Sequence, residues 1–169
     1  IIAAAASHGR ACVQVLYVRG ARVLGSKTFY PPLKLQESPA EILAAFIPQF
    51  YLGVDRAVPA EVIVNTKLKD ADILAEALTA KAQRQVKVRS RVRESRAQWL
   101  TLAQQTAETN LAAHLAGRQT ILARLQALQD LLGLPELPER LECFDISHSS
   151  GEATVASCVV FDQHGPRKA

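Results

Sequence analysis

A long helical stripe near the middle of the chain constrains its fold more than any other feature. Between residues 95 and 132, leucine and alanine recur every three to four positions, and Gly133 followed by Pro135 ends the pattern. A single helix of that length would extend roughly 57 Å, which is more than one small domain can cover. Gly117 would also allow two stacked helices. We therefore expect a helical connector over 94–138, with a folded segment on each side.

The segment before the connector, 1–93, has the pattern of an α/β domain. Apolar and β-branched runs predict strands at 1–7, 11–18, 22–30, 61–64 and 86–92. Helical spacing predicts one helix that begins at Pro39 and another over about 70–82. The short connections His8-Gly9 and Arg19-Gly20 favour antiparallel hairpins between the first three strands. After the connector, the segment 139–169 has strand patterns at 141–148 and 154–161.

The first helix has a well-marked beginning. Ser38 can cap it, Pro39 suits the first helical position, and Glu41 completes a capping box. Pro48 should kink or shorten this helix, because proline removes a backbone hydrogen bond.

Composition and cysteine usage bound the class of protein. Apolar residues make up 49% of the 169 residues and charged residues 21%, as in globular proteins. No apolar run approaches the ~18 residues of a membrane helix, so no membrane partner is expected. Cys12, Cys143 and Cys158 show no Cys-x-x-Cys spacing and lie in apolar stretches, so we expect small buried thiols. A reducing cytoplasmic location follows from these observations.

Positive charge is concentrated between residues 81 and 96. Seven basic residues stand there against Glu94, within a net charge of +4: Lys81, Arg84, Lys87, Arg89, Arg91, Arg93 and Arg96. Four of them, Arg89, Arg91, Arg93 and Arg96, are candidate DNA-binding residues, because cations hold phosphates without reading sequence. The alternative is a solvated edge strand, which Lys and Arg commonly protect from pairing. Trp99, the first aromatic residue after the cluster, is expected to pack on the helical stripe.

Asp145 carries the sharpest chemical signal in the chain. It stands within an apolar strand, where a carboxylate is costly unless it is paired or binds a cation. Its oxygen atoms suit Mg²⁺ or Mn²⁺, which could activate water, so Asp145 is the candidate catalytic and metal-binding residue. The alternative is a strand-end carboxylate paired with an arginine or capping a turn. His148 and Glu142 lie three residues away, on the opposite face of the strand, where a structural hydrogen bond and a solvated or paired carboxylate are expected.

The two ends of the chain echo each other. Residues 1–8 (IIAAAASH) align with residues 141–148 (LECFDISH), and a strand follows each stretch, with five extra residues in the second hairpin. The echo places Ala5 where the second copy has Asp145. Two identities alone are as consistent with coincidence as with a repeated fold.

Several stretches together carry a resemblance to a known family. The string Glu-Cys-Phe-Asp-Ile-Ser-His at 142–148 is specific, and 151–157, 15–20, 47–53 and 59–64 add to it. These stretches resemble the UvrC family, the incision subunits of the bacterial excinuclease. The resemblance implies that 139–169 is the truncated opening β-hairpin of a catalytic RNase H-like domain, which follows the helical connector. The order of elements over 1–93, together with the similarity of the two chain ends, predicts an α/β fold there: an RNase H-like mixed sheet with flanking helices, a degenerate copy without catalytic carboxylates.

The resemblance also implies a function. The parent protein would cut damaged DNA in nucleotide excision repair, and this region would contribute Asp145 to the metal-dependent 5′ incision endonuclease. The expected partners are damaged double-stranded DNA and the UvrB subunit, the latter bound through a segment outside this chain. The remaining catalytic residues are expected beyond Ala169, so the fragment alone should be inactive. The alternative, which we favour for 1–93, is a non-catalytic module that positions DNA and partner subunits.

The degenerate copy makes a geometric prediction. In RNase H-like domains the first carboxylate lies on strand one and another near the end of strand four, which here correspond to Ala5 and Asn65. Strands one to three should then be antiparallel, strand four should lie parallel beside strand one, and Ala5 should lie close to Asn65.

Overall fold

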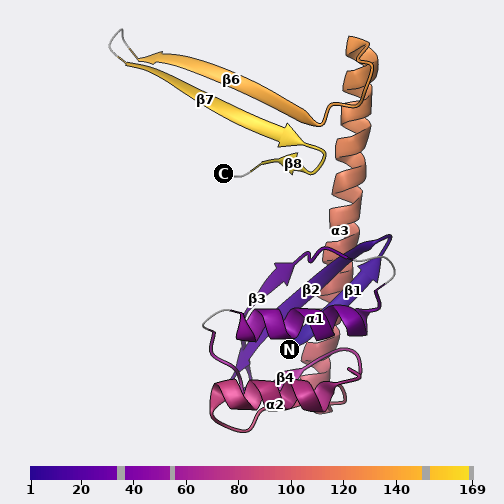
Figure 1. Ribbon diagram of the computed structural model, residues 1–169, viewed down its shortest axis with the longest axis vertical. Coiled ribbons are helices and arrows are strands. Elements are labelled where there is room, and N and C mark those ends of the chain that lie inside the picture. Colours follow the sequence, from indigo (N-terminus) through magenta and orange to yellow (C-terminus); the bar gives the residue numbers. More distant parts are fainter. Residues whose placement is uncertain (34–36, 54–55, 150–152, 168–169) are drawn as a thin grey trace. The chain divides into compact units, whose positions relative to one another are not determined.

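The computed structural model describes residues 1–33, 37–53, 56–149 and 153–167 (Figure 1). The chain divides into two compact units, Ile1–Ala112 and Ala113–Ala169. Helix α3 (Glu94–Leu132) contributes to both. Within the described ranges, no helix is both long and apolar enough to cross a membrane.

The first unit is a mixed sheet with helices. Its elements before α3 are β1 (Ile2–Ser7), β2 (Arg10–Arg19), β3 (Arg22–Phe29), α1 (Pro39–Leu52), β4 (Glu61–Ile63), α2 (Ala71–Ala82) and β5 (Lys87–Arg89). Strands β1, β2 and β3 pair antiparallel, and β4 pairs parallel with β5. A parallel bridge between Ile2 and Val64 places the end of β4 beside β1. The predicted directions are confirmed: a three-stranded sheet, β1-β2-β3, and a two-stranded sheet, β4-β5, meet at this bridge.

Two tight turns set the register of the antiparallel strands. His8 and Gly9 have φ values of 49° and 69°, and Gly20 and Ala21 have values of 53° and 57°. Positive φ at both central residues is the geometry that matches the twist of a two-residue hairpin. Ala21 adopts it at a steric cost that glycine would not have.

The capping box of α1 forms as predicted. The backbone N–H of Glu41 donates to Ser38 Oγ at 3.4 Å, and the Ser38 N–H donates to Glu41 Oε2 at 2.7 Å. Of the two predicted effects of Pro48, a kink or a shortening of the helix, the shortening is wrong, because α1 continues to Leu52. Proline removes one hydrogen bond, while Ile47 and the last turn beyond Pro48 are held by burial in the core.

The alternation of side chains along β1 and β2 builds two apolar layers. Ile2 and Val15 face a core shared with α1 and α2, whereas Ala3 and Leu16 pack on the opposite face with Ala103 of α3. The members of the first core from the strands are Ile2, Ala4, Ala11, Val13, Val15, Val62 and Val64. The sheet therefore lies between α1 and α2 on one face and the first half of α3 on the other. Trp99 packs against the α3 layer, as predicted.

Helix α3 is one continuous helix, so of the two predicted alternatives the single helix is correct. The predicted stripe is its buried face within the first unit, where Ala103, Ala107 and Leu111 are each at most 3% exposed. A polar contact joins this face to the sheet. The buried Gln14 accepts hydrogen bonds from Thr28 at 2.6 Å and from Asn110 of α3 at 3.3 Å.

The second unit contains the rest of α3 and a hairpin. Strand β6 (Arg140–Ser149) pairs antiparallel with β7 (Ala153–Asp162), and β7 pairs with the short β8 (Gly165–Pro166), which the sequence pattern did not predict. Gly165 has a φ of 105°, and a Cβ there would lie 3.2 Å from Ile121 Cδ1. The β8 turn therefore contacts α3 through glycine.

The prediction of three buried thiols is correct only for Cys12. Cys12 is fully buried, and burial raises the pKa of its thiol to about 11. Cys143 and Cys158 are exposed. They belong to β6 and β7, where apolar neighbours such as Phe144 and Val155 are also exposed, at 64% and 63%. Apolar composition indicated burial, but burial requires a second layer, and the described residues provide none over this hairpin.

Candidate functional site

Asp145 lies near the middle of β6, opposite Ser157 of β7, and is exposed. Its carboxylate is a hard oxygen ligand of the type that Mg²⁺ and Mn²⁺ accept. Among the described residues, no group of three or more His, Cys, Asp or Glu side chains is placed to hold a metal ion. The described residues therefore show no assembled metal site around Asp145, and its metal-binding role stays a prediction.

The predicted neighbours of Asp145 have different environments. Glu142 forms an ion pair with Arg140 at 2.6 Å, so the expectation of a solvated or paired carboxylate is confirmed. The predicted hydrogen bond of His148 concerns a side chain outside the described part of the chain.

Both hairpins are antiparallel: Ala5 pairs with Cys12 in the first, and Asp145 pairs with Ser157 in the second. The last pair before the turn is Ser7–Arg10 in the first hairpin and Ser149–Ala153 in the second. That last pair lies two residues after Ala5 but four residues after Asp145, so the equivalence of Ala5 and Asp145 stays a prediction.

Asn65 joins the end of β4 to β1 through its side chain. The N–H of Ala4 donates to Asn65 Oδ1 at 3.0 Å, and Asn65 Nδ2 donates to the Ala4 carbonyl at 2.9 Å. The amide therefore continues the pairing that the Ile2–Val64 bridge begins. The prediction that Asn65 lies close to Ala5 is confirmed, because Asn65 binds the backbone of the residue next to it.

This pair of positions is poorly suited to hold a metal ion. Ala5 provides no ligand atom and is only 8% exposed. It lies on the same face as Ala3, which packs against Ala103 of α3. The carbonyl oxygen of Asn65 is neutral and already accepts a backbone hydrogen bond. A dehydrated divalent cation would find neither charge nor room here.

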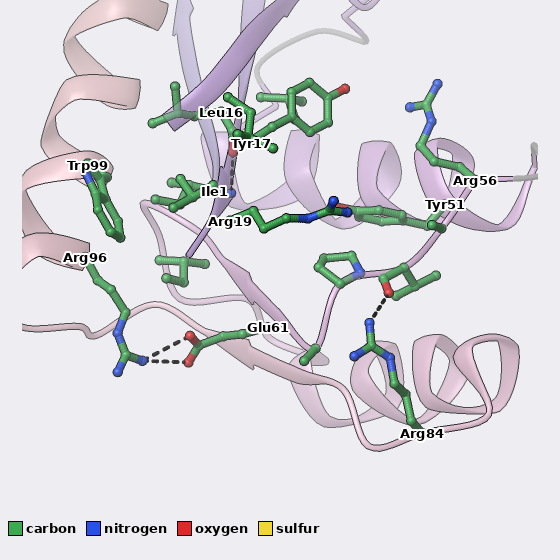
Figure 2. A pocket seen from close by; sticks show the side chains of 18 residues that line it. Ile1, Leu16, Tyr17, Arg19, Tyr51, Arg56, Glu61, Arg84, Arg96 and Trp99 are labelled. Atoms are coloured by element: carbon green, nitrogen blue, oxygen red, sulfur yellow. Dashed lines mark hydrogen bonds and ion pairs between the residues drawn. The ribbon is translucent and has the colours of Figure 1, made fainter. Parts of the chain in front are cut away.

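The basic cluster divides into paired and unpaired arginines. Glu61 forms ion pairs with Arg89 at 2.9 Å and with Arg96 at 3.0 Å, the latter drawn in Figure 2. Arg91 and Arg93 are exposed, and neither forms an ion pair with any described residue. We call residues 89–96 the basic loop; it lines a polar hollow of about 430 Å³.

Glu61 is the residue of this region that sequence reasoning missed. It lies at the start of β4, in parallel register with Lys87 of β5, and so faces the basic loop. In the sequence, Glu61 is visible only as a single acidic residue at the start of a buried strand. The parallel pairing of β4 with β5 is what shows which arginines Glu61 neutralises.

The comparisons with known proteins agree with this geometry. Residues 1–114 match the family described as UvrC Ribonuclease H-like domain, and residues 129–169 match the family described as UvrC RNAse H endonuclease domain. The chain belongs to the UvrC family. As a UvrC-family chain, it has an RNase H-like domain within its mixed α/β fold, as predicted.

Curated relatives with the name UvrABC system protein C align over nearly the whole chain. The protein of Pseudomonas putida is 52% identical over 169 residues, and those of Pseudomonas entomophila and Pseudomonas aeruginosa are 51% identical. Each alignment covers 99% of this UvrC-family chain and 28% of the relative, so the chain spans little more than a quarter of their length. No solved structure shows a significant match.

Proposed function

We propose that this chain is part of an incision subunit of bacterial nucleotide excision repair and contributes Asp145 to the endonuclease that makes the 5′ cut. One observation carries the proposal: Asp145 lies in the leading strand of the segment that matches the UvrC RNAse H endonuclease domain. Asp145 would hold Mg²⁺ or Mn²⁺ together with ligands outside the described residues. The bound ion would activate water and neutralise charge on the phosphate.

Asp145→Asn in the full-length parent protein tests this role. The amide keeps the shape of the side chain but removes the charge that holds the metal ion, so 5′ incision of a lesion-containing duplex should fall by a factor of a hundred or more, on the order of the loss for a removed transition-state stabiliser. The 3′ cut and assembly on damaged DNA should persist. Retention of the 5′ cut would exclude Asp145 as a ligand, and loss of both cuts would indicate misfolding.

A second role, positioning without chemistry, is proposed for residues 1–93. The supporting observation is the Asn65 amide, whose two polar groups are both engaged by the Ala4 backbone. This segment would be an RNase H-like domain that has lost its carboxylates and serves as a scaffold. Its proposed partners are damaged double-stranded DNA and, through the parent protein, the UvrB subunit.

Within this scaffold, the basic loop is the proposed DNA contact. Arg91 and Arg93 are the members of the loop that form no ion pair with a described residue, so their charge is available to phosphates. Arg89 and Arg96 are partly neutralised by Glu61.

The double variant Arg91→Ser/Arg93→Ser should weaken duplex binding by this chain and reduce the logarithmic salt slope by about two, roughly one for each phosphate contact. Arg89→Ser/Arg96→Ser removes the same charge and is the matched control, with a smaller expected effect. Affinity is measured by fluorescence anisotropy over a range of salt concentrations. Equal losses of affinity in both variants would show a general electrostatic attraction and no specific contact by Arg91 and Arg93. Unchanged affinity in both variants would mean that these arginines only protect the edge strand from pairing.

A further inference from the structure

A cavity of about 620 Å³ lies in the first unit (Figure 2), and its described lining includes neither Ala5 nor Asn65. Its walls come from the end of β2, the segment 56–60 that leads into β4, and the first turns of α3. This volume is in the range of sites for molecules of nucleotide size. The roles discussed so far do not use it.

Its rim is positively charged. Arg19, Arg56, Arg84 and Arg96 line the cavity, and Glu61 is the one acid among the described lining residues. Four positive charges against one negative charge leave an excess of three. Arg96 is held by Glu61 and Arg84 donates to the Val58 carbonyl at 2.9 Å. Arg19 is exposed and forms no ion pair with a described residue. An anionic ligand would therefore meet arginines from four separate segments.

Arg56 contributes to the rim in a different way. Its guanidinium lies over the Phe50 ring at 3.7 Å, so its position is fixed by a residue of α1 that does not itself line the cavity.

The remaining walls are aromatic and apolar. Tyr17 is 39% exposed at the cavity, and Trp99 of α3 is partly buried beside Leu16. Aromatic side chains next to arginines are the combination that binds unpaired nucleotides, with bases stacked and phosphates paired. An acidic peptide would use the arginines in the same way, but it would not need the neighbouring polar hollow.

That hollow decides between the two ligands. The hollow of the basic loop and the cavity share Arg96 as a lining residue. A strand whose phosphates contact Arg91 and Arg93 could continue past Arg96 to the cavity. We propose that the cavity binds one unpaired nucleotide of a DNA strand, with its base against Trp99 and Tyr17 and its phosphate on Arg19. This inference rests on the proposed function, because it extends the strand that the basic loop contacts.

The fluorescence of Trp99, the one tryptophan in the chain, tests the inference directly. A short oligothymidylate should quench it in a saturable way, whereas an abasic oligonucleotide of equal length should not, because quenching requires a stacked base. Arg19→Ser should weaken the quenching titration about tenfold, the scale of one lost charge-assisted hydrogen bond. Arg10→Ser removes the same charge at the opposite end of β2 and should leave the titration unchanged.

The other outcomes separate this inference from the proposed function. Loss of affinity in Arg91→Ser/Arg93→Ser, with Arg19→Ser unaffected, would overturn the cavity proposal and leave the loop contact standing. The reverse pattern would support the cavity and overturn the loop contact. Quenching by an acidic peptide but not by oligothymidylate would overturn the nucleotide assignment in favour of a protein partner. Circular dichroism of each variant confirms that the fold is retained.

Discussion

Asn65 shows how one side chain can hold two strands together. Its amide both donates to and accepts from the backbone of Ala4, which a carboxylate cannot do. The side chain thereby continues the strand pairing between β4 and β1.

Asn65→Asp is therefore expected to destabilise the first unit by about 1–3 kcal/mol at neutral pH, because a carboxylate oxygen would face the Ala4 carbonyl without a proton. The loss should shrink as the pH falls, because the protonated acid can donate again. The folded-state pKa of the new carboxyl should be raised, so its penalty appears as the pH rises through the unfolded-state value. Urea unfolding at several pH values measures this effect. Recovery of stability on adding Mg²⁺ would reveal a latent metal site and contradict the scaffold role.

At the scale of single elements, the hairpins are specified by their turns. Both two-residue loops require positive φ, and glycine supplies only one of the two positions in each. His8 and Ala21 adopt left-handed conformations because the antiparallel register holds them there. The strain at Ala21 is local and is a target for stabilisation.

Ala21→Gly should stabilise the first unit by about 1 kcal/mol, the scale of the left-handed penalty for a residue with a Cβ. The control is Ala123→Gly at an exposed position of α3, where the same substitution should destabilise the helix by about 1 kcal/mol. Thermal unfolding monitored by circular dichroism reports both. If Ala21→Gly lowers the stability instead, the added backbone entropy of glycine in the unfolded chain outweighs the relief of strain at Ala21.

At the scale of the whole molecule, the first unit has its own core. The cluster from β1 to Val86, the α3 layer around Ala103 and the Gln14–Thr28–Asn110 contact all lie within Ile1–Ala112. Trp99 belongs to this unit and reports on it alone.

We expect residues 1–112 to fold without the rest of the chain. Their urea midpoint, followed by Trp99 fluorescence, should match that of the whole chain, and Leu78→Ala should lower the stability of both by about 2–5 kcal/mol. Leu78 is fully buried, which is why a large loss is expected. A midpoint that falls sharply in the shorter chain would show that the first unit depends on residues beyond 112.

Local patterns predicted the elements well. The capping box at Ser38, the stripe from Ala103 to Leu111 and the strand at 141–148 are consequences of spacing within one segment. Pro48 does not end the helix, because its unfavourable effect is local, whereas the burial of Ile47 and Phe50 that outweighs it depends on distant strands. The prediction that Cys143 is buried is wrong for a related reason, because composition cannot show whether a second layer covers the hairpin.

By itself, the sequence determined the order of elements from β1 to β7, the family and the position of Asp145, because these depend on residue type and on spacing along the chain. The tertiary structure decided the pairings between distant segments. Only the parallel pairing of β4 with β5 gives Glu61 its arginines, only the bridge from β1 to β4 brings Asn65 to Ala4, and only folding collects four arginines around one cavity. Such contacts form because hydrogen bonding and apolar burial bring remote residues together, and no local pattern encodes which partners will meet.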